Sequence, residues 1–262
     1  MLLRNPRSRV LAVCAVLVLA LLGTAAFAPL PFSVAQPGLT ANVLGDNKGQ
    51  PVISITGAAV RKTSGQLRMV TIEATGPSTD VDLGQAIDGW FRTDRAVMPR
   101  DAVYPGGGSD AQIEKHNLAE MKGSQDDATE AALNYLGDSS DKVKVTLHLA
   151  DVGGPSAGLL FSLGIVDKLD GDGAGADLTG GRTIAGTGTI DASGKVGAVG
   201  GVALKTQSAA RDGASVFLVP KAECSDAKSG LPHGLRLIPV TTLKGTVAVL
   251  QTLKKGGSVP SC

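Results

Sequence analysis

The sequence predicts an α/β fold, of the α+β kind, in which short mixed sheets and helices follow one N-terminal transmembrane helix. An apolar run of about twenty residues lies near the start of the chain. The remainder alternates between stretches with the two-residue period of strands and stretches with the 3.6-residue period of helices. The 35 glycines indicate many tight turns and close backbone approaches. With 262 residues, 43% of them hydrophobic, the chain can bury one sizeable core.

The N-terminal segment has the features of a membrane anchor. Three arginines within residues 1–9 precede an apolar run over residues 10–30, which is long enough to cross a bilayer once as a helix. The A-x-A pattern at residues 26–28 makes a cleavable signal peptide the alternative. Since no basic residue follows until Lys48, the positive-inside rule predicts a cytoplasmic N-terminus and an extracytoplasmic remainder at the cell membrane.

The remaining elements follow from local patterns. Residues 31–50 are expected to be a linker, residues 51–256 one domain and residues 257–262 a tail. Alternating or short apolar runs predict strands at residues 52–56, 67–74, 142–149, 183–190, 195–199, 216–219 and 235–240. Apolar residues at helical spacing predict helices at residues 82–91, 124–136, 156–169, 202–211 and 241–254.

Two of these helices carry more specific expectations. The helix at residues 82–91 should pack one apolar face on the sheet; that face comprises Leu83, Ala86, Ile87, Trp90 and Phe91. Ser124 and Asp127 form a capping-box pattern that predicts the start of the helix at residues 124–136, and Gly137 is placed to end it in the left-handed conformation.

The composition gives little support for nucleic-acid binding. The 25 Lys and Arg residues are balanced by 24 Asp and Glu residues, so the chain has no strong overall field. Aromatic residues make up only 3% of the chain and leave few rings on which bases could stack. We therefore expect no nucleic-acid partner.

The motif Gly-Pro-Ser-Ala-Gly at residues 154–158 points to a nucleophile. It places Ser156 at the start of a buried helix, where unpaired backbone N–H groups and the helix dipole can hold an oxyanion. Gly154 and Pro155 precede the serine, and the flanking glycines let a substrate backbone come close. A serine that only caps the helix is the alternative, because short motifs of this kind recur by chance.

An activating base is needed, and the three histidines have poor contexts for that role. His116 lies in a polar stretch and His233 in a Pro-Gly turn, while strand alternation favours a surface position for His148. We keep His148 only as an accessory candidate because it precedes the serine loop closely.

Lys205 has a better context. It shares one helical face with Val202 and Ala209, and this face is expected to be buried. Burial disfavours the charged ammonium and lowers the pKa of a lysine towards neutrality, which frees a lone pair for general-base work. A lysine that lifts its ammonium to the rim of the core is the alternative.

Together, the two motifs resemble the peptidase domain of Lon-type serine proteases, family S16. The family's nucleophile lies in a Gly-Pro-Ser-Ala-Gly motif like that around Ser156, and its catalytic lysine falls at the position of Lys205. The family's threonine that helps to position this lysine corresponds to Thr187. The resemblance is clearest over residues 143–254 and weaker upstream, where residues 93–124 look like an insertion.

The resemblance implies an ATP-independent serine endopeptidase with a Ser-Lys dyad and an acyl-enzyme mechanism. No P-loop pattern is found, so exposed or unfolded polypeptides are the expected substrates. The chain looks like the membrane-anchored branch of the family, here without its usual PDZ domain. A homo-oligomer is expected by resemblance, and no cofactor or metal is expected. The alternatives are a peptide-binding module without activity and an esterase that uses Ser156, Asp226 and His233.

The cysteines leave one question open. Cys14 lies in the apolar run, whereas Cys224 and Cys262 share the expected outer compartment, in which a disulfide can persist. The sequence does not place their Cα atoms within bonding range, so a disulfide and two free thiols are both compatible with it.

Overall fold

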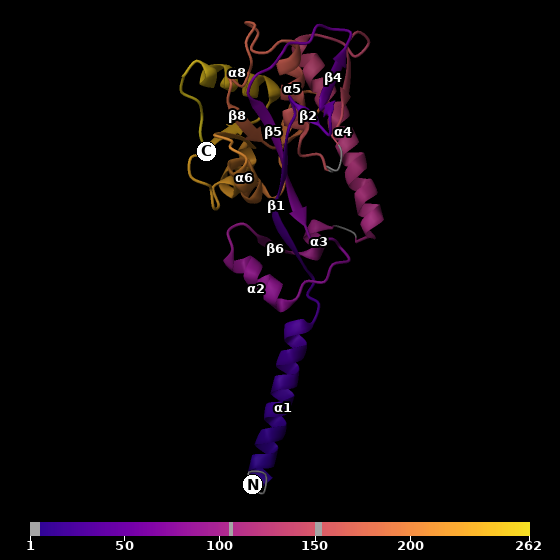
Figure 1. The fold of residues 1–262 in the computed structure, drawn as a ribbon, viewed down its shortest axis with the longest axis vertical. Helices are drawn as coiled ribbons and strands as arrows, with labels where there is room; N and C mark the ends of the chain where they lie inside the picture. Colours follow the sequence, from indigo (N-terminus) through magenta and orange to yellow (C-terminus); the bar gives the residue numbers. More distant parts are fainter. Residues whose placement is uncertain (1–5, 105–106, 150–153) are drawn as a thin grey trace. The chain divides into compact units, whose positions relative to one another are not determined.

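The structure, a computed structural model, describes residues 6–104, 107–149 and 154–262. The chain divides into two compact units (Figure 1). The first unit comprises Met1–Ala35 and Ala74–Asp110, and the second comprises Gln36–Glu73 and Ala111–Cys262. Each unit therefore combines segments that are distant in the sequence.

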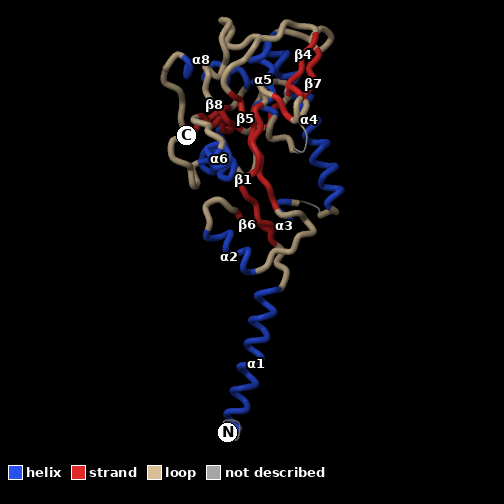
Figure 2. The backbone as a smooth tube through the Cα atoms, viewed as in Figure 1, coloured by secondary structure: helices blue, strands red, loops and turns tan. Residues whose placement is uncertain are grey.

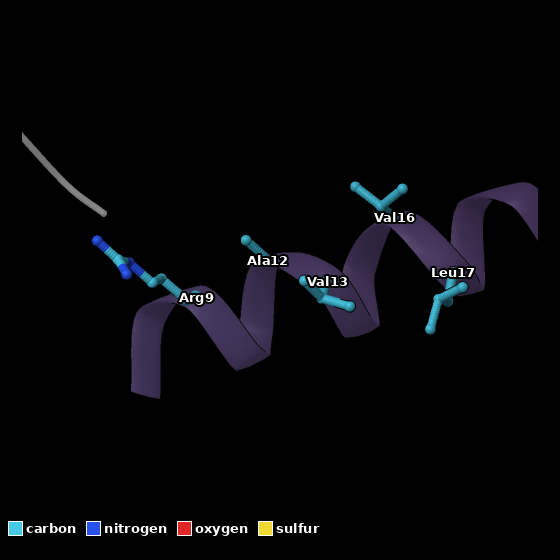
Figure 3. Close-up of a pocket in the computed structure, with 5 residues that line it drawn as sticks. All are labelled: Arg9, Ala12, Val13, Val16 and Leu17. Carbon is cyan, nitrogen blue, oxygen red and sulfur yellow. The ribbon is translucent and has the colours of Figure 1, made fainter. Parts of the chain in front are cut away.

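The first unit contains the apolar helix α1 (Pro6–Phe27), which has no buried residue. Figure 3 shows apolar side chains along this helix, among them Val13, Val16 and Leu17. By length and composition α1 could cross a membrane, a property that it would also have as a signal sequence. The unit also holds helix α2 (Leu83–Phe91), strand β6 (Ala96–Pro99) and the short helix α3 (Arg100–Val103).

Residues 31–50, expected as a linker, contain strand β1 (Phe32–Asn42) instead. In the first unit the start of β1 pairs antiparallel with β6, and the buried Ser33 and Ala35 alternate with more exposed neighbours. Pro37 and Gly38, which favoured a linker, lie within the strand. Local composition misled here because the strand is stabilised by partners far along the chain.

The second unit is built on a sheet with the strand order β12-β11-β8-β5-β1. Its other strands are β5 (Gln66–Ala74), β8 (Thr183–Gly186), β11 (Val216–Pro220) and β12 (Arg236–Val240). Strands β5, β8, β11 and β12 pair in parallel. Figure 2 shows strands β5 and β8 of this sheet in red, among helices drawn in blue.

Helices cover both faces of this sheet. They are α4 (Asp110–Leu136), α5 (Gly158–Leu169), α6 (Val202–Arg211), α7 (Cys224–Ala227) and α8 (Leu243–Lys254), with a 3₁₀ turn, η1, at Lys221–Glu223. Successive residues of a strand point to opposite faces. Ile184 and Leu218 accordingly join the core cluster that contains most of α5, whereas Ala185 and Phe217 join a second cluster with residues of α6.

Two small antiparallel sheets complete the second unit together with the hairpin of β2 (Asp46–Asn47) and β3 (Gln50–Pro51). Strand β4 (Ile53–Thr56) pairs with β7 (Lys144–Leu147), and β9 (Thr189–Ile190) pairs with β10 (Val196–Gly197). The single strand expected at residues 183–190 is therefore wrong. It is interrupted at Thr187 and Gly188. The Thr187 N–H still donates to the Leu218 carbonyl of β11, but the Thr187 hydroxyl group and the Gly188 N–H donate to the Ser156 carbonyl.

The capping box expected at Ser124 is also wrong. Ser124 lies in the middle of α4, which begins at Asp110, and the residue is 5% exposed. Gly137 has φ +73° and ends this helix in the predicted left-handed conformation. The helix expected from Ser156 begins two residues later, at Gly158.

Helix α2 forms as predicted, but the expectation for its packing is wrong. Asp82 caps it and makes a capping box with Gln85. The buried residues are the small Ala86 and Gly89, whereas the large apolar side chains of this helix are exposed; they are Leu83 at 37%, Ile87 at 43%, Trp90 at 63% and Phe91 at 87%.

The cysteine question is resolved by a disulfide between Cys224 and Cys262, whose Cα atoms are 5.4 Å apart. The bond ties the C-terminal tail to α7. Val259, within this tail, is buried, and its carbonyl oxygen accepts a hydrogen bond from Arg236.

Candidate active site

The Ser156 turn is held against the segment that follows β8. The carbonyl oxygen of Ser156 accepts hydrogen bonds from the Gly188 N–H (2.9 Å) and from Thr187 Oγ1 (3.2 Å). In return, the Leu159 N–H donates to the Gly188 carbonyl at 3.1 Å. These three bonds fix the backbone of the Gly-Pro-Ser-Ala-Gly motif relative to Thr187.

Lys205 reaches the same threonine from α6. Its side chain is buried, as predicted, on a face shared with Val202 and Ala209. Its Nζ donates to Thr187 Oγ1 at 3.2 Å, and Thr187 itself is fully buried. Thr187 therefore connects the amine of Lys205 to the backbone of Ser156, so the structure brings the three predicted residues into one cluster.

The environment of Lys205 favours the neutral amine. Burial lowers the pKa of Lys205 to about 8, while the negative charge of Glu223 opposes this effect and raises the pKa. A lysine with such a pKa has a substantial neutral fraction at slightly alkaline pH, whereas an exposed lysine does not. The neutral amine can accept a proton from a nearby hydroxyl group.

Helix α4 supports the serine turn from the other side. Ser124 Oγ donates to the Pro155 carbonyl oxygen at 2.9 Å, and the Gly154 N–H donates to the Asn117 carbonyl oxygen at 3.0 Å. A Cβ atom at Gly158 would lie 2.9 Å from Ser124 Oγ, which explains a glycine at that position. Sequence reasoning missed these contacts; the only signal was a serine on the buried side of α4 with Met121 and Ala128.

A comparison with known protein families matches this part of the chain. Residues 127–252 match the family model of the Lon protease (S16) C-terminal proteolytic domain. The chain carries a Lon S16 peptidase domain, a serine endopeptidase. The matched stretch starts within α4, ends within α8 and includes the whole Ser156, Thr187 and Lys205 cluster.

The start of α6 is built to hold the lysine of this Lon peptidase domain. Gly201 precedes the helix with φ +68°, and a Cβ atom there would lie 3.0 Å from the Ile72 side chain. Asp226 Oδ2 accepts hydrogen bonds from the N–H groups of Val202 (3.0 Å) and Ala203 (3.3 Å). A carboxylate at a helix N-terminus satisfies unpaired donors and interacts favourably with the helix dipole.

This role of Asp226 weakens the esterase alternative. The carboxylate faces the α6 N-terminus, and His233 is exposed. The other histidines are exposed as well: His116 lies 3.4 Å from Glu120, and the backbone N–H of His148 donates to the Val52 carbonyl. Within the described residues, no histidine of the Lon peptidase domain is buried beside Ser156.

Of the backbone N–H groups expected to hold an oxyanion, some already donate to a protein acceptor and others are available. The Gly154 N–H is already bonded to Asn117, and Pro155 has no N–H. In the described part of the chain, the N–H groups of Ser156 and Ala157 have no protein acceptor. These two amides, rather than that of Gly154, are available at the turn. Across the described residues, no group of three or more His, Cys, Asp or Glu side chains could hold a metal ion.

Proposed function

We propose that this chain is a membrane-anchored, ATP-independent serine endopeptidase that cleaves exposed or unfolded polypeptides outside the cytoplasm. Ser156 is the nucleophile and Lys205 the general base. The observation that carries the proposal is the buried amine of Lys205, bonded to a threonine that in turn holds the backbone of Ser156. A buried lysine with a lowered pKa, connected through Thr187 to a serine in a turn before a helix, suits acyl transfer.

The proposed chemistry proceeds in two steps. Neutral Lys205 takes the Ser156 hydroxyl proton while Oγ attacks the peptide carbonyl carbon, and the N–H groups of Ser156 and Ala157 stabilise the oxyanion. The tetrahedral intermediate collapses, the peptide C–N bond breaks, and the departing amine receives the proton from Lys205. Water then attacks the carbonyl carbon of the acyl-enzyme while Lys205 accepts a proton from that water. The ester bond to Ser156 breaks, Lys205 returns the proton to Ser156 Oγ, and the new C-terminal carboxyl group leaves. Thr187 orients the amine throughout.

Two observations support a location outside the cytoplasm. Helix α1 is long and apolar, and basic residues lie on its N-terminal side. The disulfide between Cys224 and Cys262 is typical of oxidising compartments. Protease protection of oriented membrane vesicles tests this topology, since the peptidase domain must be digested only from the extracytoplasmic side.

Hydrolysis of unfolded casein without ATP tests the activity. We expect the full-length protein in detergent to cut casein, and we expect Ser156→Ala and Lys205→Met to lose about 10⁴-fold or more in kcat, as removal of a nucleophile or base does. Methionine is close in shape to lysine but cannot accept the proton. Circular dichroism of all three proteins controls for folding. A Lys205→Met variant that cuts casein at the wild-type rate would contradict the proposed base.

A peptide-binding module without activity is the second candidate. It predicts that the folded wild-type protein binds casein but leaves it intact. Reaction with a serine-directed phosphonate separates the two, because only an activated Ser156 forms the covalent adduct.

A further inference from the structure

Helix α2 presents an apolar face that the described residues leave largely exposed. Leu83, Ile87, Trp90 and Phe91 recur at positions i, i+4, i+7 and i+8, so they lie on one side of the helix. All four are exposed to the extents given above. An exposed row of large apolar side chains on one helix marks an interaction surface.

The opposite side of α2 packs against its own unit through small residues, so the large apolar residues face outward. Gly89 packs so closely that an added Cβ atom would lie 2.6 Å from Val97 Cγ2. On the outer face, the ring of Trp90 meets the ring of Phe32 edge to face, with centroids 6.4 Å apart, but Trp90 remains 63% exposed. The helix is therefore docked through its small residues, and turning its large residues inward would break this packing.

The position of α2 in the first unit identifies what covers the face. Helix α1 ends at Phe27, and the N–H of Leu30 donates to the Val81 carbonyl at 2.8 Å, one residue before the Asp82 cap. Three residues span at most about 11 Å. Figure 1 shows α2 beside the C-terminal end of α1, with which it is in contact. If α1 spans the bilayer, α2 starts within the depth of its headgroup region.

We propose that α2 is an interfacial helix that lies in the outer headgroup region, with Leu83, Ile87, Trp90 and Phe91 turned towards the acyl chains. The inference rests on the proposed role of α1 as a retained anchor. Tryptophan is enriched at membrane interfaces, and amphipathic helices with aromatic apolar faces lie in the plane of the interface.

The charges around α2 specify the lipid. Arg95 pairs with Asp88 at 2.9 Å, and Arg92 pairs with Asp94 at 2.8 Å. The arginines of this segment are thus matched by carboxylates and leave little positive charge for anionic headgroups. Zwitterionic phosphatidylcholine should therefore be sufficient, and added anionic lipid should change the binding little.

The chain contains one tryptophan, Trp90, which makes a direct test possible. The full-length protein is reconstituted in phosphatidylcholine vesicles whose acyl chains carry bromine at a shallow or a deep position. We expect blue-shifted emission, stronger quenching by the shallow bromine than by the deep bromine, and weak quenching by aqueous iodide.

The variant Ile87→Asp with Phe91→Asp keeps Trp90 and should lose most of the bromine quenching while iodide quenching rises. The matched control, Leu39→Asp with Val60→Asp, also replaces two exposed apolar residues, outside α2, and should behave like the wild type. Casein hydrolysis by both variants shows that the peptidase domain has folded.

Flotation of the vesicles separates failure of this inference from failure of the anchor. If the chain floats but Trp90 is quenched by iodide and not by bromine, the interfacial helix is refuted and the anchor stands. If Trp90 is protected from both quenchers, a protein covers the face and the lipid assignment is wrong. If the chain does not float, both the anchor and the interfacial helix fall.

Discussion

Burial of Lys205 lowers the stability of the folded state at neutral pH. Since its pKa falls from 10.5 to about 8, the folded state binds this proton less tightly than the unfolded chain does. The destabilisation is fully present below pH 8 and disappears as the pH rises to about 10.5, where both states are neutral. Its upper bound is roughly 3 kcal/mol at neutral pH.

Lys205→Met should therefore be inactive yet more stable than the wild type at pH 7, by about 1 to 3 kcal/mol. Urea unfolding at pH 7 and pH 10 measures this. The advantage of the variant should shrink at pH 10, and an advantage that stays the same at both pH values would show that burial of the charge is not its source.

Glu223 also affects the pKa of Lys205. Its negative charge raises the pKa of Lys205, so Glu223→Gln should lower that pKa further. The ascending limb of kcat/KM against pH, expected near pH 8 in the wild type, should then move to lower pH. Glu114→Gln, an exposed substitution on α4, is the control and should leave the limb in place. A shift to higher pH in Glu223→Gln would contradict the electrostatic account.

At the scale of elements, α4 contacts the serine turn through two hydrogen bonds, of which one comes from a side chain, the hydroxyl group of Ser124. Ser124→Ala removes the hydrogen bond to the Pro155 carbonyl and frees the turn that carries Ser156. We expect a loss of about 1 kcal/mol in stability and a fall in kcat larger than the change in KM.

Ser162→Ala is the matched control for Ser124→Ala. Ser162 is also buried, but its hydroxyl donates to Leu159 within α5 and does not reach the turn. Steady-state kinetics and thermal unfolding of both variants check the prediction. Equal losses of kcat in the two variants would remove the specific role of Ser124.

The elements that the sequence predicted best are those that depend on local signals. Helix α6 has the predicted bounds because Gly213 takes φ +82° after it, and the helix expected at residues 241–254 forms as α8, which begins at Leu243 after the Thr242 cap. The expectations for the packing of α2 and for the role of Ser124 were wrong, because contacts with distant segments determine both. The packing of α2 depends on Gly89 against Val97, and Ser124 donates to Pro155 across 31 positions of sequence.

At the scale of the whole molecule, the candidate site could be predicted from local motifs, whereas the division into two units could not. Ser156, Thr187 and Lys205 were identified through motifs, and the structure brings them together. The two units could not be foreseen, because β1 pairs with β6 in the first unit and lies next to β5 in the second. Pairings between such distant segments leave no periodic signal in either one.

The disulfide stabilises the second unit by closing a loop with a sequence separation of 38. Replacing Cys224 and Cys262 by serine should lower the free energy of unfolding by about 3 to 4 kcal/mol, because the unfolded chain regains the entropy of that loop. Urea unfolding under oxidising conditions measures the loss, and dithiothreitol should reduce the wild type to the stability of the variant. If neither change affects stability, the bond contributes nothing to the fold.

The rate at which a serine-directed phosphonate labels Ser156, measured from pH 6 to pH 10, tests the Ser156–Lys205 dyad most directly. We predict that labelling of the wild type accelerates through about pH 8 as Lys205 loses its proton, and that folded Lys205→Met and Ser156→Ala are not labelled. Labelling of Lys205→Met at the wild-type rate, with the same pH dependence, would show that another group activates the serine.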